Sequence, residues 1–479
     1  MGQPGNDASS GVENAVARLR EATRDTPYAG RLYLVGGMLR DRALGLPLSG
    51  DLDLVLEGDA VALARFLFEK GLSRHFPVLY PRFGTAMLSL STGDGECAVE
   101  LVTARSERYQ PDSRKPDVTA GTIRDDVLRR DFTINTLLEN VHSGEILDIT
   151  GAAWSDLAEG VLRTPVDPRI TFFDDPLRML RAIRFAARFG FKIDDAAWEA
   201  IRSETARLRP PAIAWERIRE EFIKIARLPA AKFREGMELL LDSGLLAEFL
   251  PEMLPMVGCT QGTWHHADVW THTLEALSCL PDESRVELRL GLLWHDVGKP
   301  PTRAETEDAK GVRFTGHAGI GSEIVREMMG RLKFSNDEIR DVTTLVTLHM
   351  RLGEYRPEWT DASVKRLIRD CGVYLDELFV LTRCDQSAID LPAEYQGLLF
   401  SLRERVDRLN ATSNVLKISS PLDGLSIMEL LAVGPGPHLR EAKEFLTNEV
   451  IEGRLAEGDA LRARERLARW WEERKALGS

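Results

Sequence analysis

Strand-like segments occur only in the first third of this 479-residue chain. Helical patterns lie between and after them, at 59–70 and 124–140. From residue 150 onward the pattern is helical and is interrupted by proline and glycine. Because a chain of this length exceeds one hydrophobic core, the sequence predicts a small mixed α/β domain followed by all-helical domains. The strand-like runs are 31–35, 51–56, 83–91 and 97–104.

Composition and charge are ordinary for a globular protein. Apolar residues make up 43% and charged residues 29% of the chain, and no apolar run reaches the roughly 20 residues that span a bilayer. The first residues lack the pattern of a secretory signal, so we expect a cytoplasmic protein without membrane contact. The net charge of −13 argues against non-specific coating of nucleic acid, but it allows a local basic groove. The five scattered cysteines have no CxxC spacing, which argues against a thiolate zinc site or a disulfide framework.

A glycine pair and an acidic strand follow one another near the N-terminus. Alternation along a strand places Asp51 and Asp53 on one face, with the intervening leucines in the core. Two such carboxylates can hold a pair of Mg²⁺ ions, which activate an attacking hydroxyl and stabilise a leaving pyrophosphate. Gly36 and Gly37 let the backbone approach a phosphate closely, and Arg40 is placed to reach the same triphosphate. Each feature alone is weak, but the combination is specific.

Arginines are concentrated on a helix that the sequence predicts over 174–190, with Pro176 in its first turn and Gly190 at its end. Their spacing places them along one face, while apolar residues between them form a second stripe for packing. Taken alone, such a stripe is most often a solvated basic face. The arginines are Arg178, Arg181, Arg184 and Arg188.

Histidine and aspartate recur at wide spacing in the second half of the chain, each within an apolar helical context. Neutral imidazole and carboxylate ligands from several helices can enclose a divalent metal and leave positions open for water and phosphate. The residues are His272, His295, Asp296, His317, His349 and Asp385.

The N-terminal segments resemble the head domain of the polymerase β-like nucleotidyltransferases. The closest resemblance is to class II tRNA nucleotidyltransferases and bacterial poly(A) polymerases. The resemblance implies Asp51 and Asp53 as Mg²⁺ ligands, with Glu100 as an assisting carboxylate. Its segments are LVGGMLRD (34–41), SGDLDLVLEGD (49–59), YPRFGTAML (80–88), VELVTARSERY (99–109) and LRRDFTINTL (128–137). The nucleotide contacts that it implies are Gly36, Gly37, Arg40, Asp41, Arg129, Arg130, Asp131 and Asn135.

The same resemblance implies that Asp175 and Arg178 read the Watson–Crick edge of the incoming base. A carboxylate accepts from an exocyclic amine and a guanidinium donates to a ring nitrogen, which suits CTP and ATP and rejects the other two nucleotides. Arg181 would hold this pair or touch phosphate. We interpret the segment Trp215–Arg219 as structural or as a sugar–phosphate contact.

The spacing of the histidines resembles the HD superfamily of metal-dependent phosphohydrolases over residues 235–395. It implies a first site for a divalent transition metal at His272, His295, Asp296 and Asp385. His317 and His349 would bind a second metal or a substrate phosphate, and Lys299 would assist phosphate binding. Metal ligands alone do not establish hydrolysis.

The leading interpretation is a CCA-adding tRNA nucleotidyltransferase that binds the tRNA 3′ acceptor end and carries an HD domain. Sister specificities remain open: CC addition, A addition or poly(A) synthesis. An alternative of another class is an HD phosphohydrolase with a regulatory nucleotide-binding head. The sequence makes no prediction of oligomeric state. The predicted regions are an N-terminal helix or tail (1–28), the head (29–150), a helical neck and body (151–234), the HD domain (235–395) and a C-terminal helical region (396–479).

Overall fold

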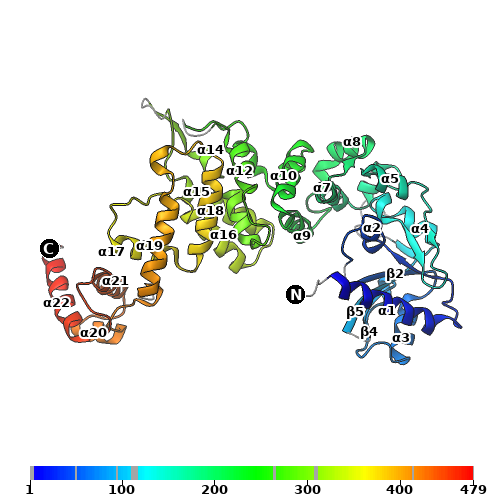
Figure 1. The fold of residues 1–479 in the computed structure, drawn as a ribbon, viewed down its shortest axis with the longest axis horizontal. Helices are drawn as coiled ribbons and strands as arrows, with labels where there is room; N and C mark the ends of the chain where they lie inside the picture. Colours follow the sequence, from blue (N-terminus) through cyan, green and yellow to red (C-terminus); the bar gives the residue numbers. More distant parts are fainter. Residues whose placement is uncertain are drawn as a thin grey trace. The chain divides into compact units, whose positions relative to one another are not determined.

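The chain forms two compact units, Met1–Pro251 and Glu252–Ser479, coloured from blue to green and from green to red in Figure 1. Within the described ranges, no helix combines the length and apolar character needed to cross a bilayer. The computed structural model describes residues 5–48, 51–92, 95–108, 117–262, 266–306, 311–412 and 415–477.

A seven-stranded sheet lies at the centre of the head, with strand order β3-β4-β5-β2-β1-β8-β9. Strands β2 and β5 are parallel, and the other paired neighbours are antiparallel. Helices α1 (Gly5–Thr23) and α3 (Ala60–Glu69) cover one face, where Leu52, Leu54 and Leu56 are buried. The four predicted strands are confirmed as β1, β2, β4 and β5. The strands are β1 (Leu32–Val35), β2 (Leu52–Leu56), β3 (Val78–Tyr80), β4 (Thr85–Thr92), β5 (Gly95–Thr103), β8 (Leu138–Asn140) and β9 (Ile146–Leu147).

The helix predicted over 124–140 is wrong for most of its length. Helix α4 (Ile123–Leu128) is short, and a 3-10 turn, η2 (Thr133–Asn135), and strand β8 follow it. Several residues of the turn are β-branched, which lowers helix propensity. Strand β8 pairs with β1, where Leu138 lies opposite Val35, so burial in the sheet outweighs the local helical pattern.

The helix predicted over 174–190 is two helices. Helix α6 (Pro168–Asp174) ends before Asp175, and α7 (Leu177–Phe189) begins after Pro176. A residue before proline is pushed out of the helical region, and Asp175 is extended, with φ −142° and ψ 97°. The end of the helix is as predicted, because Gly190 closes α7 with φ 71°.

Helices build most of the chain after residue 150. The sequence did not predict three short two-stranded sheets, of which one precedes residue 150 and two follow it. The predicted boundary at 234/235 falls inside α10, which packs against α7 and α9 of the first unit. The remaining helices of this unit are α5 (Ala153–Glu159), α8 (Asp195–Glu204), α9 (Trp215–Ala226), α10 (Ala230–Asp242) and α11 (Leu246–Phe249). The short strand pairs are β6 (Arg105–Arg108) with β7 (Asp117–Ala120), β10 (Val161–Leu162) with β11 (Lys192–Ile193), and β12 (Arg303–Glu305) with β13 (Val312–Phe314).

The second unit begins with packed helices that carry the histidines. Here α13 contacts α12, α16 and α18, and α15 packs on α16. A sharp turn at Gly298 brings the chain against the start of α15, so closely that a Cβ there would lie 2.1 Å from the carbonyl oxygen of His317. The helices are α12 (Val269–Leu277), α13 (Val286–Trp294), α14 (Lys299–Thr302), α15 (His317–Arg331), α16 (Asn336–Leu348), α17 (Asp361–Cys371), α18 (Leu375–Ser387), α19 (Leu398–Thr412), α20 (Gly424–Leu431), α21 (Pro437–Ile451) and α22 (Ala460–Leu477).

Candidate active site

Three carboxylates lie together on the sheet face opposite α1 and α3. Asp53 of β2 is the register partner of Glu100 of β5, and Asp51 immediately precedes β2. Burial and then the charge of Asp51 raise the pKa of Asp53, although Arg130 acts in the opposite direction. Burial and then Asp53 raise the pKa of Glu100. Mutual repulsion of this kind is what a bound divalent cation relieves.

The three carboxylates share a cavity of 350 Å³, called here the acidic cavity. Its other walls are largely apolar. The acidic cavity is lined by Asp51, Leu52, Asp53, His75, Phe76, Val78, Met87, Leu88, Ser89, Ala98, Val99 and Glu100.

The glycine pair forms the turn between β1 and α2 (Gly37–Ala43). Gly36 has φ 80°, a conformation that favours glycine. A Cβ on Gly36 would lie 3.5 Å from Asp53 Oδ2 and 3.8 Å from Arg130 Nη1, so the turn backbone passes close to both groups. The glycine pair therefore brings backbone to the edge of the carboxylate site.

A second cavity, of 260 Å³, begins at this turn and contains five guanidinium groups. Guanidinium groups match the oxygens of phosphate in geometry and charge, so this arginine cavity suits a triphosphate. The arginine cavity is lined by Gly36, Gly37, Arg40, Asp53, Arg130, Asp131, Asn135, Arg181, Arg184, Phe185 and Arg188.

Arg40 and Asp41 have stronger protein contacts than the sequence suggested. Arg40 is only 4% exposed, donates to Asp41 and to Asn135 Oδ1 at 2.6 Å, and lies over the Phe185 ring. Asp41 also lies 3.2 Å from Arg188 and is absent from the described lining of the arginine cavity. Both residues therefore tie α2 to α7, and Arg40 still forms part of the cavity wall.

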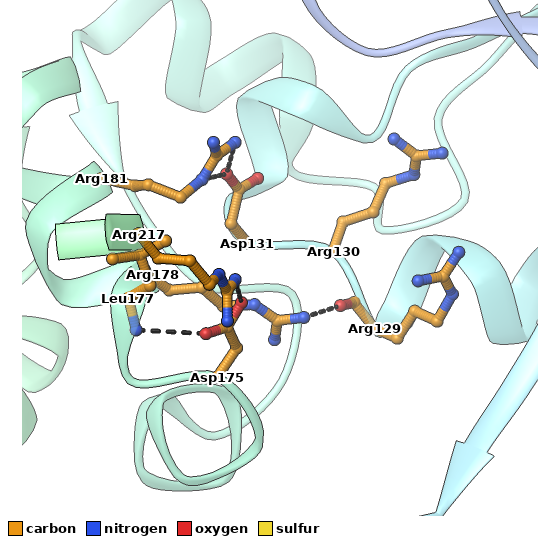
Figure 2. A pocket seen from close by; sticks show the side chains of 8 residues that line it. All are labelled: Arg129, Arg130, Asp131, Asp175, Leu177, Arg178, Arg181 and Arg217. Atoms are coloured by element: carbon orange, nitrogen blue, oxygen red, sulfur yellow. Dashed lines mark hydrogen bonds and ion pairs between the residues drawn. The ribbon is translucent and has the colours of Figure 1, made fainter. Parts of the chain in front are cut away.

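A third cavity, of 290 Å³, lies beside the first turn of α7 (Figure 2). Arg178 donates from Nη2 to the carbonyl of Arg129 at 2.6 Å and from Nη1 to the carbonyl of Thr171 at 3.2 Å. These two bonds fix the plane of its guanidinium group, and its remaining N–H groups are available to a ligand. This Asp175 cavity is lined by Arg129, Arg130, Asp131, Asp175, Leu177, Arg178, Arg181 and Arg217.

The carboxylate of Asp175 is oriented by two neighbours. Arg217 Nη2 donates to Oδ2 at 3.0 Å, and the backbone N–H of Leu177 donates to Oδ1 at 3.2 Å. Each oxygen keeps a further lone pair for an exocyclic amine. Arg178 and Asp175 therefore offer a donor and an acceptor in one cavity.

Asp131 lies between the arginine cavity and the Asp175 cavity and lines both. Arg181 donates to its Oδ2 at 2.6 and 2.9 Å, and Asn135 Nδ2 donates to its Oδ1 at 2.9 Å. Burial alone would raise the pKa of Asp131, but Arg181 and the hydrogen bonds lower it to about 2. The contact with Asn135 crosses a 3-10 turn, within the range 124–140 where the sequence predicted a helix.

The second unit brings together all six predicted histidine and aspartate ligands in two clusters that share Asp296. One cluster is His272, His295, Asp296 and Asp385, and the other is Asp296, His317 and His349. Asp296 Oδ2 lies 3.1 Å from His295 Nε2 and 3.6 Å from His272 Nε2, whereas Oδ1 lies 3.5 Å from His317 Nε2. The shared carboxylate can therefore bridge two ions.

The imidazoles of these clusters are oriented as metal ligands. Each of the four donates its Nδ1–H to a backbone carbonyl: His272 to Ala388, His295 to Leu292, His317 to Phe314 and His349 to Val346. Carbonyls only accept, so Nδ1 carries a proton in each ring and the Nε2 atoms converge on the centre, which is the ring orientation that metal ligation through Nε2 requires. Burial and then His295 lower the pKa of His349 to about 4, so that ring is neutral near pH 7. The donor set therefore fits a divalent transition metal.

Comparison with known proteins agrees with this architecture. The poly(A) polymerase head-domain model matches residues 32–163, the probable RNA- and SrmB-binding site of polymerase A matches 190–256, and the HD-domain model matches 262–385. The A-adding tRNA nucleotidyltransferase of Deinococcus radiodurans is 31% identical over 93% of this chain and 97% of its own length. The chain belongs to the tRNA nucleotidyltransferase family.

Relatives within the tRNA nucleotidyltransferase family carry different specificities in their names. The CC-adding enzyme of Thermus thermophilus is 35% identical over 75% of this chain and 80% of its own length. Among solved structures, the Bacillus stearothermophilus CCA-adding enzyme with CTP has a TM-score of 0.65 at 20% identity, covering 98% of each chain. That likeness shows a shared fold.

The sequence did not predict two buried acidic residues, Asp126 and Glu221, that hold arginines of the site in place. Asp126 has no exposed surface and accepts from both Arg129 and Arg130. Burial would raise its pKa, but the two arginines lower it. Glu221 of α9, 2% exposed, accepts from Arg184 at 2.8 Å. Two features of the sequence could have identified these acids. Asp126 precedes Arg129 by three residues and Arg130 by four, and Glu221 follows the Trp215–Arg219 segment.

Proposed function

We propose that this chain adds C, C and A to the 3′ end of tRNA, using CTP and ATP without a nucleic-acid template. The observation that carries the proposal is that one unit holds the carboxylates, the arginine cavity and the Asp175 cavity side by side, with Asp53 and Asp131 each lining two neighbouring cavities. A nucleotide can then place its triphosphate among arginines and its base beside Asp175.

Asp51 and Asp53 would hold two Mg²⁺ ions, with Glu100 assisting, and these ions supply activation of the hydroxyl and charge neutralisation on the phosphates. The primer 3′-oxygen forms a bond to the α-phosphorus, the bond from that phosphorus to the bridging oxygen breaks, and pyrophosphate leaves. The hydroxyl proton passes to solvent. Arg130 and Arg188 bind the triphosphate, and the Gly36 backbone approaches it.

Asp175 and Arg178 select the base in this proposal. The carboxylate accepts from the amine of cytosine or adenine, and the guanidinium donates to the adjacent ring nitrogen. Uracil and guanine present a carbonyl oxygen where the amine would be, and that oxygen faces the carboxylate unfavourably. Arg217 and the carbonyls of Arg129 and Thr171 hold the two side chains in register.

The deciding experiment uses three tRNA transcripts ending before CCA, after C and after CC. Each is incubated with Mg²⁺ and the four nucleotides singly and together, and products are resolved at single-nucleotide length. Addition of CCA followed by arrest supports the proposal. Addition of CC alone, A alone or a long A tract moves the protein to a sister specificity. If no transcript is extended, the remaining alternative is a phosphohydrolase with a regulatory nucleotide-binding head.

A second function is favoured by the histidine clusters. The converging Nε2 atoms and the bridging Asp296 suit two divalent metals, and Lys299 Nζ, 2.6 Å from Asp296 Oδ2, provides a cation for a phosphate. We assign this unit a metal-dependent phosphohydrolase activity in a cytoplasmic enzyme. Assays with phosphomonoesters and with cyclic and linear phosphodiesters, each with Mn²⁺, Ni²⁺, Co²⁺ or Mg²⁺, test it. Absence of turnover under every condition would overturn it.

A further inference from the structure

Asp53 lines two cavities of opposite chemical character. The arginine cavity has five guanidinium groups, whereas the described lining of the acidic cavity contains three carboxylates and neither lysine nor arginine. A triphosphate carries several negative charges and belongs with the arginines. The acidic cavity must therefore accept a group of low negative charge.

The apolar part of the acidic cavity continues directly from the carboxylates. Four residues form one register row across neighbouring strands, in the order Val78, Met87, Glu100 and Asp53. Paired residues in such a row share a sheet face. The surface beside Glu100 is thus an apolar shelf on the same face as the carboxylates.

This shelf is open to solvent. Phe76, Val78 and Met87 are 61%, 54% and 49% exposed. The Phe76 ring is held by edge contact with Phe68, with ring centroids 5.3 Å apart and planes at 77°. A contiguous exposed apolar group next to a catalytic centre is typical of a binding surface, and it includes one aromatic ring.

The geometry of the reaction identifies the occupant. In an in-line displacement the attacking hydroxyl and the leaving pyrophosphate lie on opposite sides of the phosphorus, and both meet the metal pair. With the pyrophosphate among the arginines, the hydroxyl approaches Asp53 from the acidic cavity. The nucleoside that carries that hydroxyl then lies over the shelf.

We propose that the acidic cavity binds the terminal nucleoside of the RNA primer, with its base on Phe76, Val78 and Met87 and its 3′-hydroxyl toward Asp53. This inference rests on the proposed nucleotidyl transfer. The terminal base changes after each addition, so the site must accept different bases. Stacking on an apolar and aromatic surface meets that need, because every base has a π-face.

The test compares Phe76→Leu, Val78→Ser and Met87→Ser with wild type in steady-state addition of CTP to a tRNA lacking CCA. The KM for tRNA should rise roughly 5- to 100-fold across the set, the range expected for a lost stacking contact, while the KM for CTP stays within twofold. Ile146→Ser is the matched control, since Ile146 is 39% exposed on the opposite edge strand β9. It should leave both constants unchanged.

A second measurement is independent of turnover. Wild-type protein without nucleotide is irradiated with tRNA carrying a terminal 4-thiouridine, and the crosslinked peptide is identified. Crosslinks within residues 76–87 support the inference. Two results would overturn this inference and leave the proposed nucleotidyl transfer standing. One is crosslinks confined to the Asp175 cavity, and the other is an unchanged KM for tRNA in all three variants when the wild-type enzyme extends tRNA normally. A wild-type enzyme that extends no primer overturns the proposed function and this inference together.

Discussion

Glu100 lies directly opposite Asp53, its register partner across the parallel pair β5 and β2. The two carboxylates come from strands separated by α3, β3 and β4 in the sequence. Burial is the main cause of the raised pKa of both groups; the charge of Asp53 further raises the pKa of Glu100, and the charge of Asp51 further raises that of Asp53. A divalent cation bound by these carboxylates would relieve their repulsion.

Asp53→Asn should abolish nucleotide addition, because a metal ligand is lost. Glu100→Gln should lower it about 10- to 100-fold, as expected for an assisting group, with partial recovery at high Mg²⁺. The folded state holds a proton on Asp53 more tightly than the unfolded state does, so neutralising it should leave the metal-free protein at least as stable. Addition rates measured as a function of Mg²⁺ concentration report the effect on activity, and thermal melting reports the effect on stability. Full activity in Asp53→Asn would contradict the metal assignment.

Arg178→Ala should relax base choice more than it slows addition of the correct nucleotide. A pair of hydrogen bonds to a base edge is worth about 1–3 kcal/mol of discrimination, and Arg178 supplies one bond of the pair, so the preference for CTP over UTP should fall roughly 5- to 100-fold. Competition assays with mixed nucleotides measure the ratio. Arg202→Ala, on the exposed surface of α8, is the control. An unchanged ratio would remove Arg178 from base selection.

The metal content of the second unit should depend on which ligand is changed. Because Asp296 belongs to both clusters, Asp296→Asn should lose both ions, whereas Asp385→Asn and His349→Gln should each lose one. Elemental analysis of purified protein reports the stoichiometry. Nucleotide addition should persist in all three variants, and loss of both activities together would count against two separate sites.

Gly298→Ala should destabilise the second unit by about 3 kcal/mol, the upper part of the usual range for overpacking. A Cβ at this position would lie 2.1 Å from the His317 carbonyl oxygen and 2.6 Å from the Gly321 nitrogen, so backbone must move. Gly330→Ala is the control in α15, because nothing lies within 4 Å of its Cβ position. It should be neutral or stabilising by up to about 1 kcal/mol. Urea denaturation distinguishes the two, and equal stabilities would contradict the close packing.

Sequence predictions based on local rules were most accurate for short motifs. Strand alternation correctly placed Asp53 on β2, with Asp51 directly before the strand and lining the same cavity, and Gly190 ends α7 as predicted. The same rules failed over 124–140, where pairing of β8 with β1 outweighed a helical pattern, and at Asp175, where the following proline broke the helix. The first outcome depends on a strand distant in the sequence, whereas the second is a local effect of Pro176 on the residue before it.

The sequence by itself determined the residue types: carboxylates for divalent cations, guanidinium groups for phosphate, and imidazoles for a second metal site. Only the tertiary structure decided which of them meet. It pairs Glu100 with Asp53 across neighbouring strands. Asp126 accepts hydrogen bonds from Arg129 and Arg130, and the Arg40 guanidinium donates to Asp41 and Asn135. The physical reason is that side-chain chemistry is a property of each residue, whereas burial, register and ion pairing arise only when separate elements pack together.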